Sequence, residues 1–156
     1  MDSSLKKSSS ASNTLSPDLR DQSHNKITYK PIGIIHSPFK ELSNTPQQPE
    51  GGHDIEGFIE LFPEYTEGLE HIDRFTFITL IYDLHLSKSY SLQITKLGEG
   101  ISRGIFSTRA PQRPNPIGIS VVRLNRVEGF KIYIRDLDIV DGTPLLDIKP
   151  YKTKDY

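Results

Sequence analysis

The first residues that could do chemistry stand in a proline-rich segment, STRAPQRPNPIGIS, at residues 107–120. Each proline fixes its own φ and keeps the preceding residue out of the helical region, so this backbone is nearly forced to extend. A plain turn between strands and a polyproline ligand for another domain are two interpretations of such a loop. The third is a rigid wall that presents guanidinium and amide groups to a carboxylate, a phosphate or an aromatic ring, using Arg109, Arg113 and Asn115.

Carboxylates gather in a second segment, DLDIVDGTPLLDIKPY, at residues 136–151. Asp141, Gly142, Thr143 and Pro144 have the composition of a turn, in which aspartate accepts from backbone N–H groups and glycine takes a positive φ. A turn between strands is the simpler interpretation. The alternating leucines and isoleucines nevertheless predict a core nearby, where carboxylates are costly unless they are paired. Lys149 or an arginine of the first segment would be a natural partner for the four acids Asp136, Asp138, Asp141 and Asp147.

Other reaction types find no support in the sequence. GEGISRG, at residues 98–104, has one residue too many for a dinucleotide fingerprint and leads into IFST, which is predicted as a strand rather than a helix. The chain has no cysteine and no Gly-x-Ser-x-Gly segment, which excludes a thiolate and leaves a serine nucleophile without its usual motif. No metal site is expected, because the spacing of the histidines and nearby acids follows no known ligand pattern: His53, Asp54, His71, Asp73 and His85.

These segments would be positioned by a sheet. Short runs rich in β-branched and aromatic residues, bounded by Gly, Pro and Asp, predict strands at 29–36, 57–62, 75–86, 89–97, 117–127, 130–136 and 145–148. A hairpin is expected at Glu128 and Gly129. Residues 63–75 predict one or two short helical turns. Many short strands with little helix favour an all-β barrel or sandwich.

Charge divides the chain more clearly than its net value of −1 suggests. Residues 41–73 contain nine acids and no Lys or Arg, whereas residues 96–135 contain eight bases and two acids. Two solvated faces, or two surfaces that pair with each other, would explain this pattern. The alternative is a phosphate-facing patch suited to RNA recognition by shape and phosphate contacts.

The ends of the chain set the domain limits. Residues 1–26 include eight serines and no aromatic residue, so we expect a disordered tail, followed by one folded domain at residues 27–156. No apolar run approaches the roughly 20 residues that span a bilayer, and the N-terminus lacks the apolar core of a secretory signal. A cytoplasmic protein without membrane contact is therefore expected.

Five segments, in this order, resemble the TsaA-like family, also called the VirR family, whose characterised members are tRNA (adenine-N6)-methyltransferases. They are IGIIHSPFK (32–40), PQQPEG (46–51), IEGFIELFPEYTEGLEHIDRFTFITLIYDLH (55–85), GIFSTRAPQRPNPIGIS (104–120) and LDIVDGTPLLDIKPY (137–151). The resemblance implies a small single-domain β-barrel that binds S-adenosyl-L-methionine without a Rossmann fold, usually as a homodimer. It also implies methylation of N6 of threonylcarbamoyladenosine beside the anticodon, so the expected partner is the anticodon stem-loop of tRNA. The chain ends five residues after the last motif, as expected of the short form without a C-terminal domain.

The family's cofactor contacts can be carried over to matching positions. They fall on Pro46, Gln47 and Gln48, on His85 and Leu86, on Arg109 and Arg113, and on Leu137, Asp141, Gly142, Thr143 and Pro144. Methyl transfer to nitrogen also needs an acceptor for its proton, for which Asn115 and Asp147 are our candidates. A non-catalytic module that senses S-adenosylmethionine would carry the same pocket residues and is the alternative function.

Overall fold

The computed structural model describes residues 14, 16, 25–41, 54–96 and 98–152. The predicted cofactor residues Pro46, Gln47 and Gln48 lie outside the described residues, as does most of the predicted tail. Both assignments therefore stay predictions.

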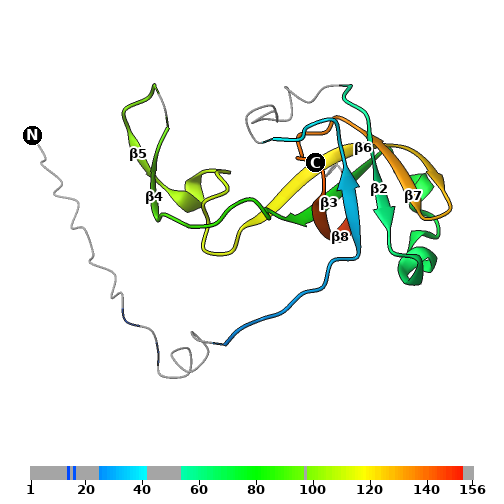
Figure 1. Cartoon of the computed structure of the whole chain (residues 1–156), viewed down its shortest axis with the longest axis horizontal. Helices are drawn as coiled ribbons and strands as arrows, with labels where there is room; N and C mark the ends of the chain where they lie inside the picture. Colours follow the sequence, from blue (N-terminus) through cyan, green and yellow to red (C-terminus); the bar gives the residue numbers. More distant parts are fainter. Residues whose placement is uncertain (1–13, 15, 17–24, 42–53, 97, 153–156) are drawn as a thin grey trace, which may run out of the picture.

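Six antiparallel strands close into a barrel in the order β1-β2-β7-β6-β3-β8 (Figure 1). Closure pairs every barrel strand on both sides, so the barrel presents no free sheet edge. The predicted all-β barrel, with short helical turns as its only helices in the described ranges, is confirmed. The strands are β1 (Gly33–His36), β2 (Gly57–Leu61), β3 (Phe77–Asp83), β6 (Ile117–Glu128), β7 (Lys131–Arg135) and β8 (Thr143–Pro150).

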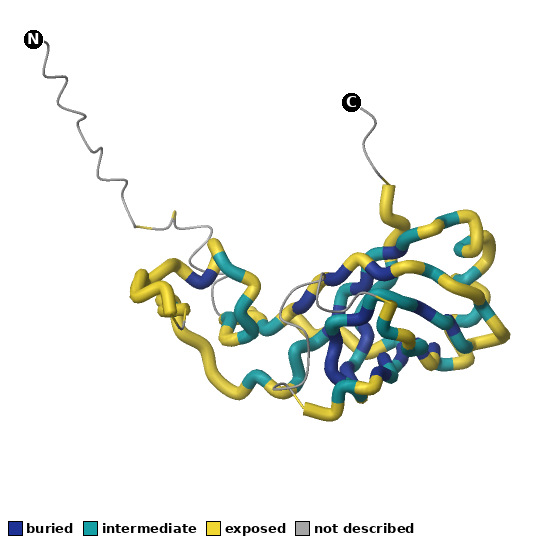
Figure 2. The backbone as a smooth tube through the Cα atoms, turned by 90° about the horizontal axis from the view of Figure 1, so that it is seen from above, coloured by how far each residue is buried: buried dark blue, intermediate teal, exposed yellow. Residues whose placement is uncertain are grey.

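Alternating side chains build the core, as the period of two in the sequence predicts. In β3 every second residue is buried, so Ile78, Leu80 and Tyr82 point inward. In β6 the buried positions are Gly118, Ser120 and Val122. Buried positions concentrate in the barrel (Figure 2). The interior is filled mainly by isoleucine and leucine, which suit a pleated and half-buried surface.

The turns at the ends of the strands follow their local sequence. Gly129, with φ of 59°, forms the tight turn between β6 and β7, which confirms the predicted hairpin. Residues 63–75 form two 3₁₀ helices, η3 (Pro63–Leu69) and η4 (Ile72–Arg74), which also agrees with the prediction. No helix in the described ranges is long and apolar enough to cross a membrane.

An arm between β3 and β6 projects away from the barrel (Figure 1). It carries a two-stranded sheet, β4 (Gln93–Thr95) and β5 (Ser102–Gly104), and the 3₁₀ turn η5 (Ile105–Ser107). The prediction of a strand for IFST is therefore wrong, because Ile105–Ser107 forms a 3₁₀ turn. The Ser107 and Thr108 hydroxyls donate to the carbonyls of Gly104 at 2.7 Å and Ile105 at 2.9 Å, and such local bonds compete with strand pairing.

Five predicted strands are shorter than expected, and three of them differ by more than two residues. Residues 29–32 lie outside β1, because Pro31 has no N–H to give to a ladder. The strand expected at 89–97 is reduced to β4, and the hydroxyl of Ser91 instead donates to the Gln93 carbonyl. The strand expected at 75–86 ends at Asp83, where the chain leaves the barrel for the arm.

Candidate functional site

Four segments with polar side chains meet at one end of the barrel. The end of β1 lies beside the start of β8, because Ile35 pairs with Thr143. The end of β3 lies between the starts of β8 and β6, because Tyr82 pairs with Leu145 and Asp83 pairs with Ile117. The barrel therefore brings together the two segments that the sequence singled out, residues 107–120 and 136–151, with residues 84–87 between them.

A small cavity of about 70 Å³ lies where these segments meet. Three predicted cofactor residues line it, His85, Leu86 and Thr143, together with Tyr82, Leu84, Ser87, Pro111, Asp138, Ile139 and Val140. Nδ1 of His85 is buried and has no hydrogen-bond partner within the described part of the chain. A buried polar atom without a partner is costly, so a ligand that bonds to Nδ1 would relieve that cost.

The proline-rich loop holds the residues before the arm in place. The N–H of Leu84 donates to the Pro116 carbonyl at 2.7 Å, and the Ser87 hydroxyl donates to the Pro111 carbonyl at 2.8 Å. These two bonds fix both ends of the segment that carries His85 and Leu86. Proline has no N–H, but its carbonyl is a full acceptor, so a rigid proline loop can serve as a template for a neighbouring turn.

The Arg113 side chain binds backbone carbonyls of its own loop and of the turn before it. Its Nη1 donates to the carbonyls of Ile105 at 3.2 Å, Thr108 at 2.7 Å and Ala110 at 3.3 Å. The guanidinium carbon also lies 5.9 Å from the centre of the Phe106 ring. The structure therefore gives Arg113 the role of a brace between η5 and the proline-rich loop, beside the cofactor contact that the resemblance implies.

Asp138 ends a partly buried chain of polar side chains that begins at Tyr82 and passes through Ser120. Its Oδ1 accepts from the Ser120 hydroxyl at 2.7 Å, and Ser120 Oγ lies 2.7 Å from the Tyr82 hydroxyl. Burial raises the pKa of the Asp138 carboxyl, although the bond from Ser120 and the charge of Arg109 oppose that rise. Burial and the charge of Asp138 raise the pKa of Tyr82 to about 12, so its hydroxyl stays protonated. Arg109, predicted as a cofactor contact, therefore acts on the electrostatics of this cavity.

Sequence reasoning missed Tyr82 and Ser120 as site residues. One signal was available for Ser120, because a serine stood at a position of β6 that the alternation assigns to the core, and a buried hydroxyl needs a partner. Nothing in the sequence showed that the partners would be Tyr82 and Asp138, which lie 38 and 18 residues away.

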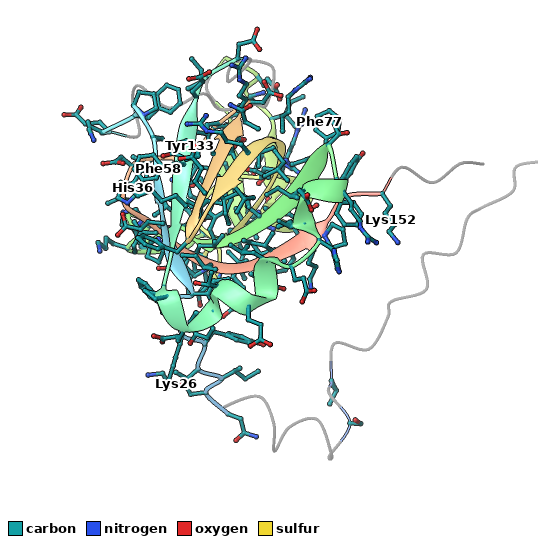
Figure 3. All side chains as sticks on the ribbon, turned by 90° about the vertical axis from the view of Figure 1, so that its right-hand side faces the viewer. Lys26, His36, Phe58, Phe77, Tyr133 and Lys152 are labelled. Carbon is teal, nitrogen blue, oxygen red and sulfur yellow. The ribbon has the colours of Figure 1, made fainter. Side chains whose placement is uncertain are left out.

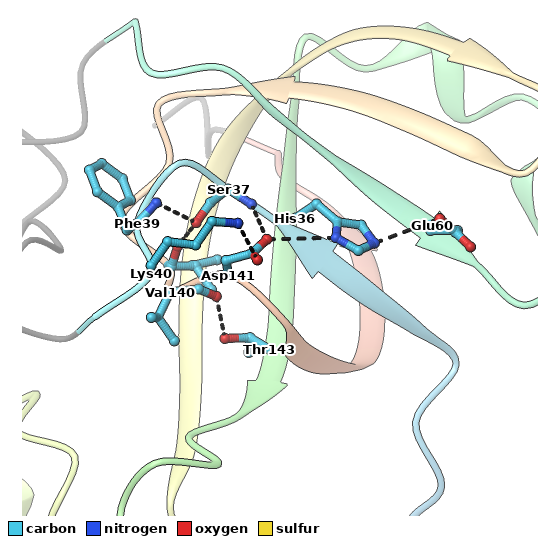
Figure 4. A network of polar contacts seen from close by, with 9 residues as sticks. His36, Ser37, Phe39, Lys40, Glu60, Val140, Asp141 and Thr143 are labelled. Carbon is cyan, nitrogen blue, oxygen red and sulfur yellow. Dashed lines mark hydrogen bonds and ion pairs between the residues drawn. The ribbon is translucent and has the colours of Figure 1, made fainter.

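Asp141 anchors a second polar network at the end of β1 (Figure 4). Its Oδ1 accepts from the Ser37 N–H at 3.0 Å and lies 3.6 Å from Nδ1 of His36, while Oδ2 accepts from Lys40 Nζ at 2.6 Å. On its other side the His36 ring lies 3.7 Å from Glu60. Partial burial alone would raise the pKa of the Asp141 carboxyl, but the bonds from Lys40 and Ser37 and the charges of Lys40 and His36 together lower it.

The turn after Asp141 is held in register with β1. Gly142 takes a φ of 81°, as predicted, and its N–H donates to the Ile35 carbonyl at 2.9 Å. The Thr143 hydroxyl donates to the Val140 carbonyl at 2.6 Å, and Pro144 follows as a β8 residue paired with Ile34. The turn therefore fixes Thr143 in the wall of the cavity.

The remaining predicted residues lie in different places. Leu137 is fully buried in the barrel core, so its side chain packs rather than lines the cavity. Asn115 is exposed in the loop, one residue before the Pro116 carbonyl that holds Leu84. Asp147 pairs with Lys149 at 2.9 Å and lines another cavity, so the structure does not bring the two predicted catalytic residues together.

That other cavity is much larger, about 810 Å³, and lies at the opposite end of the barrel under η3 and η4. Apart from Asp147, none of the described residues that were predicted for the site lines it. Size alone would favour it, since small-molecule pockets usually measure about 300–1,000 Å³. We assign the candidate site to the small cavity because chemistry-bearing side chains from four segments converge there.

The basic segment is partly neutralised within the chain. Arg135 pairs with Glu56 at 2.6 Å and so joins the basic segment to the acidic one. This contact agrees with the interpretation that the two charged surfaces pair with each other. Ion pairs also engage Lys96, Arg103, Arg123 and Arg126. These pairs are exposed and individually weak, so the basic side chains could still exchange them for contacts with RNA phosphates. The charge pattern by itself, however, does not require an RNA partner.

Comparison with known proteins identifies the family of this chain. Residues 34–155 match the sequence profile of the tRNA-methyltransferase O N-terminal domain. A probable S-adenosyl-L-methionine-binding protein of Pyrococcus abyssi is 56% identical over 125 residues, which cover 80% of this chain and 68% of that protein. The mouse tRNA (adenine(37)-N6)-methyltransferase is 34% identical over 130 residues, covering 78% of this chain and 30% of the mouse protein.

The fold has also been solved before. The crystal structure of TrmO from Pseudomonas aeruginosa matches with a TM-score of 0.69 and 37% sequence identity, over 82% of this chain and 57% of the other. This chain therefore spans little more than half the length of that solved structure.

Fold and site together define a small β-barrel that gathers polar loops around a cavity at one end. Within that class, the chain belongs to the family of the tRNA-methyltransferase O N-terminal domain, and the TsaA-like resemblance is confirmed.

Proposed function

We propose that this chain is an S-adenosylmethionine-dependent tRNA methyltransferase that methylates N6 of threonylcarbamoyladenosine next to the anticodon. The observation that carries the proposal is the cavity in which His85, Leu86 and Thr143 meet, where the buried Nδ1 of His85 has no hydrogen-bond partner among the described residues. Family membership supplies the reaction class. A relative named as a probable S-adenosyl-L-methionine-binding protein supports the cofactor. The mouse relative, named as a tRNA (adenine(37)-N6)-methyltransferase, supports the substrate.

The cavity fits part of such a cofactor. At about 70 Å³ it holds a few heavy atoms rather than a whole nucleoside, so the rest would extend over the neighbouring loops. The cofactor supplies the methyl group. The chain's own residues would orient it, with Nδ1 of His85 as a hydrogen-bond partner and with Leu86 and Val140 as apolar surface. Pro46, Gln47 and Gln48 stay proposed contacts from the resemblance.

A methylation assay tests the proposal. The purified chain should transfer the methyl group of S-adenosylmethionine to tRNA that carries threonylcarbamoyladenosine, taken from cells that lack this chain. It should not methylate the same tRNA without that modification, because the substrate nitrogen is then chemically different. Equal transfer to both would contradict the substrate, and no transfer to either would favour the alternative of an S-adenosylmethionine sensor.

We also propose that the chain acts as a homodimer in the cytoplasm, where tRNA is read. The outer face of β6 exposes three apolar side chains, Ile117, Ile119 and Val121, and Ile119 is 50% exposed. The arm exposes four more, Tyr90, Leu92, Ile101 and Phe106, and Phe106 is 76% exposed. Two such apolar surfaces on one chain suit burial against a second copy.

Replacing Ile119 with lysine should therefore convert a dimer into a monomer, because a charge at the centre of an apolar interface loses its hydration without gaining a partner. Sedimentation of the variant measures the change. Asp73→Lys, on the exposed part of η4, is the control and should stay dimeric. An Ile119→Lys protein that remains a dimer would place the interface elsewhere.

A further inference from the structure

We propose that Asp138 accepts the proton that leaves the substrate nitrogen during methyl transfer, and that Ser120 and Tyr82 are the positioning residues that hold it for this role. The proposal rests on the proposed function and adds to it the group that takes the proton.

The hydrogen bonds run in one direction, from the Tyr82 hydroxyl to Ser120 and from Ser120 to Asp138, which is the final acceptor. A hydroxyl has one proton to donate, and that of Ser120 is directed to Asp138 Oδ1. The 2.7 Å contact between Tyr82 and Ser120 must then use the proton of Tyr82. Two hydroxyls in series therefore orient one carboxylate, and Oδ2 takes no part in the bond from Ser120.

Position distinguishes this carboxylate from the other acids in the part of the chain that the structure describes. Asp138 lines the same cavity as His85 and Thr143. Asp141 lies nearby in sequence, but its two oxygens are engaged by Ser37 and Lys40. A general base must come within hydrogen-bond reach of the proton that it removes, and a carboxylate in the wall of the cavity meets that condition best.

The chemical step balances with one acceptor. The substrate nitrogen forms a bond to the methyl carbon while the sulfur–carbon bond of the methyl donor breaks and sulfur keeps the electron pair. The nitrogen would then carry a positive charge unless its N–H proton leaves. That proton passes to Asp138, and the product nitrogen is neutral. The carboxylic acid later returns the proton to water.

The surroundings of Asp138 favour a carboxyl that binds a proton more readily than an ordinary aspartate. Burial raises its pKa, and a base is most effective when its pKa approaches the working pH. The charged and titratable groups around it are Tyr82 from β3 and His85 after β3, which line the same cavity, and Arg109 from the proline-rich loop, whose charge acts on it. The charge of Arg109 opposes the rise and so favours the ionised carboxylate, the form that can accept a proton.

Asp138→Asn tests the proposal, because asparagine keeps the shape and can still accept from Ser120. Methyl transfer to tRNA with threonylcarbamoyladenosine should fall by at least about 100-fold, the usual contribution of a general base. Binding of S-adenosylmethionine and of the tRNA, measured by calorimetry, should be unchanged. Asp73→Asn neutralises an exposed carboxylate on η4 and should keep full activity.

Unfolding of the free protein provides a readout that does not depend on activity. A carboxyl with a raised pKa in the folded state destabilises the fold as pH rises above the pKa of the unfolded chain. Wild type should therefore lose stability relative to Asp138→Asn as pH rises from the ordinary carboxyl pKa through the raised one. At neutral pH the variant should be at least as stable as wild type, so its lost activity cannot come from unfolding.

The positioning residues have their own signature. Ser120→Ala removes the bond that lowers the pKa of Asp138, so the acid limb of the pH–rate profile should move to higher pH. Tyr82→Phe should move it in the same direction by less. A purely structural role would instead lower the rate equally at every pH.

The outcomes separate this proposal from the proposed function. Wild type that transfers no methyl group to the tRNA overturns the proposed function itself. An active wild type with an equally active Asp138→Asn overturns only the assignment of the base. Loss of activity in Asp147→Asn, with Asp138→Asn active, would give the role to Asp147 instead.

Discussion

Gly57→Ala is expected to destabilise the barrel by about 3 kcal/mol, the upper end of the usual cost of overpacking a core. A Cβ at this position of β2 would overlap Cδ1 of Leu137 and the backbone carbonyl oxygen of His36. Neither can move freely, because Leu137 is fully buried and His36 is held in the pairing of β1 with β2. Thermal unfolding should show a midpoint lowered by more than about 10 °C.

Gly68→Ala is the matched control. This glycine lies in η3, and a Cβ there would meet no atom within 4 Å. Alanine reduces the freedom of the unfolded chain, so the variant should be unchanged or more stable by up to about 1 kcal/mol. Equal stability of the two variants would contradict the close approach of Leu137 to β2. The result also bears on the site, because Leu137 precedes Asp138 and its packing fixes where that carboxylate lies.

The sequence predicts the parts of the fold that depend on local pattern. Alternation places Ile78 and Leu80 inside, and glycine predicts the turns at Gly129 and Gly142, both of which have positive φ. The 3₁₀ turn at 105–107 is missed because its residues have strand propensity, and side-chain bonds to the backbone decide the outcome. Local pattern thus fails where a polar side chain competes with the ladder.

The candidate site is predicted less completely, because it depends on register. His85 and Thr143, which the resemblance implies as cofactor contacts, line the same cavity. The chain from Tyr82 through Ser120 to Asp138 crosses three elements, and only the pairing of β3 with β6 places Tyr82 opposite Gly118 and near Ser120. The sequence indicated that the acids of residues 136–151 would pair with Lys149 or with an arginine of the proline-rich loop, and Asp147 does pair with Lys149. It did not indicate which acid an arginine of that loop would influence, and in the structure the charge of Arg109 acts on Asp138.

Asp141→Ala is expected to weaken binding of S-adenosylmethionine by at least about tenfold, which corresponds to about 1.4 kcal/mol. The substitution leaves the N–H of the buried Ser37 and the Lys40 ammonium without their acceptor. A buried donor without a partner costs about 1–3 kcal/mol, so the turn that holds Thr143 should loosen and the free energy of unfolding should fall by about 2 kcal/mol. Calorimetry and chemical denaturation measure the two effects.

Asp141→Asn separates the hydrogen bond from the charge, because an amide oxygen can accept from Ser37 but does not pair with Lys40 or His36. The surrounding bonds and charges lower the pKa of Asp141 in the folded state, so the ionised carboxylate stabilises the fold above the pKa of the unfolded chain. That contribution is lost as pH falls through the lowered pKa. The stability difference between wild type and Asp141→Asn should therefore be full at neutral pH and shrink in acid. A difference that stays constant in acid would mean that Asp141 acts through its hydrogen bonds alone, and that its charge has no part in holding the turn beside the cavity.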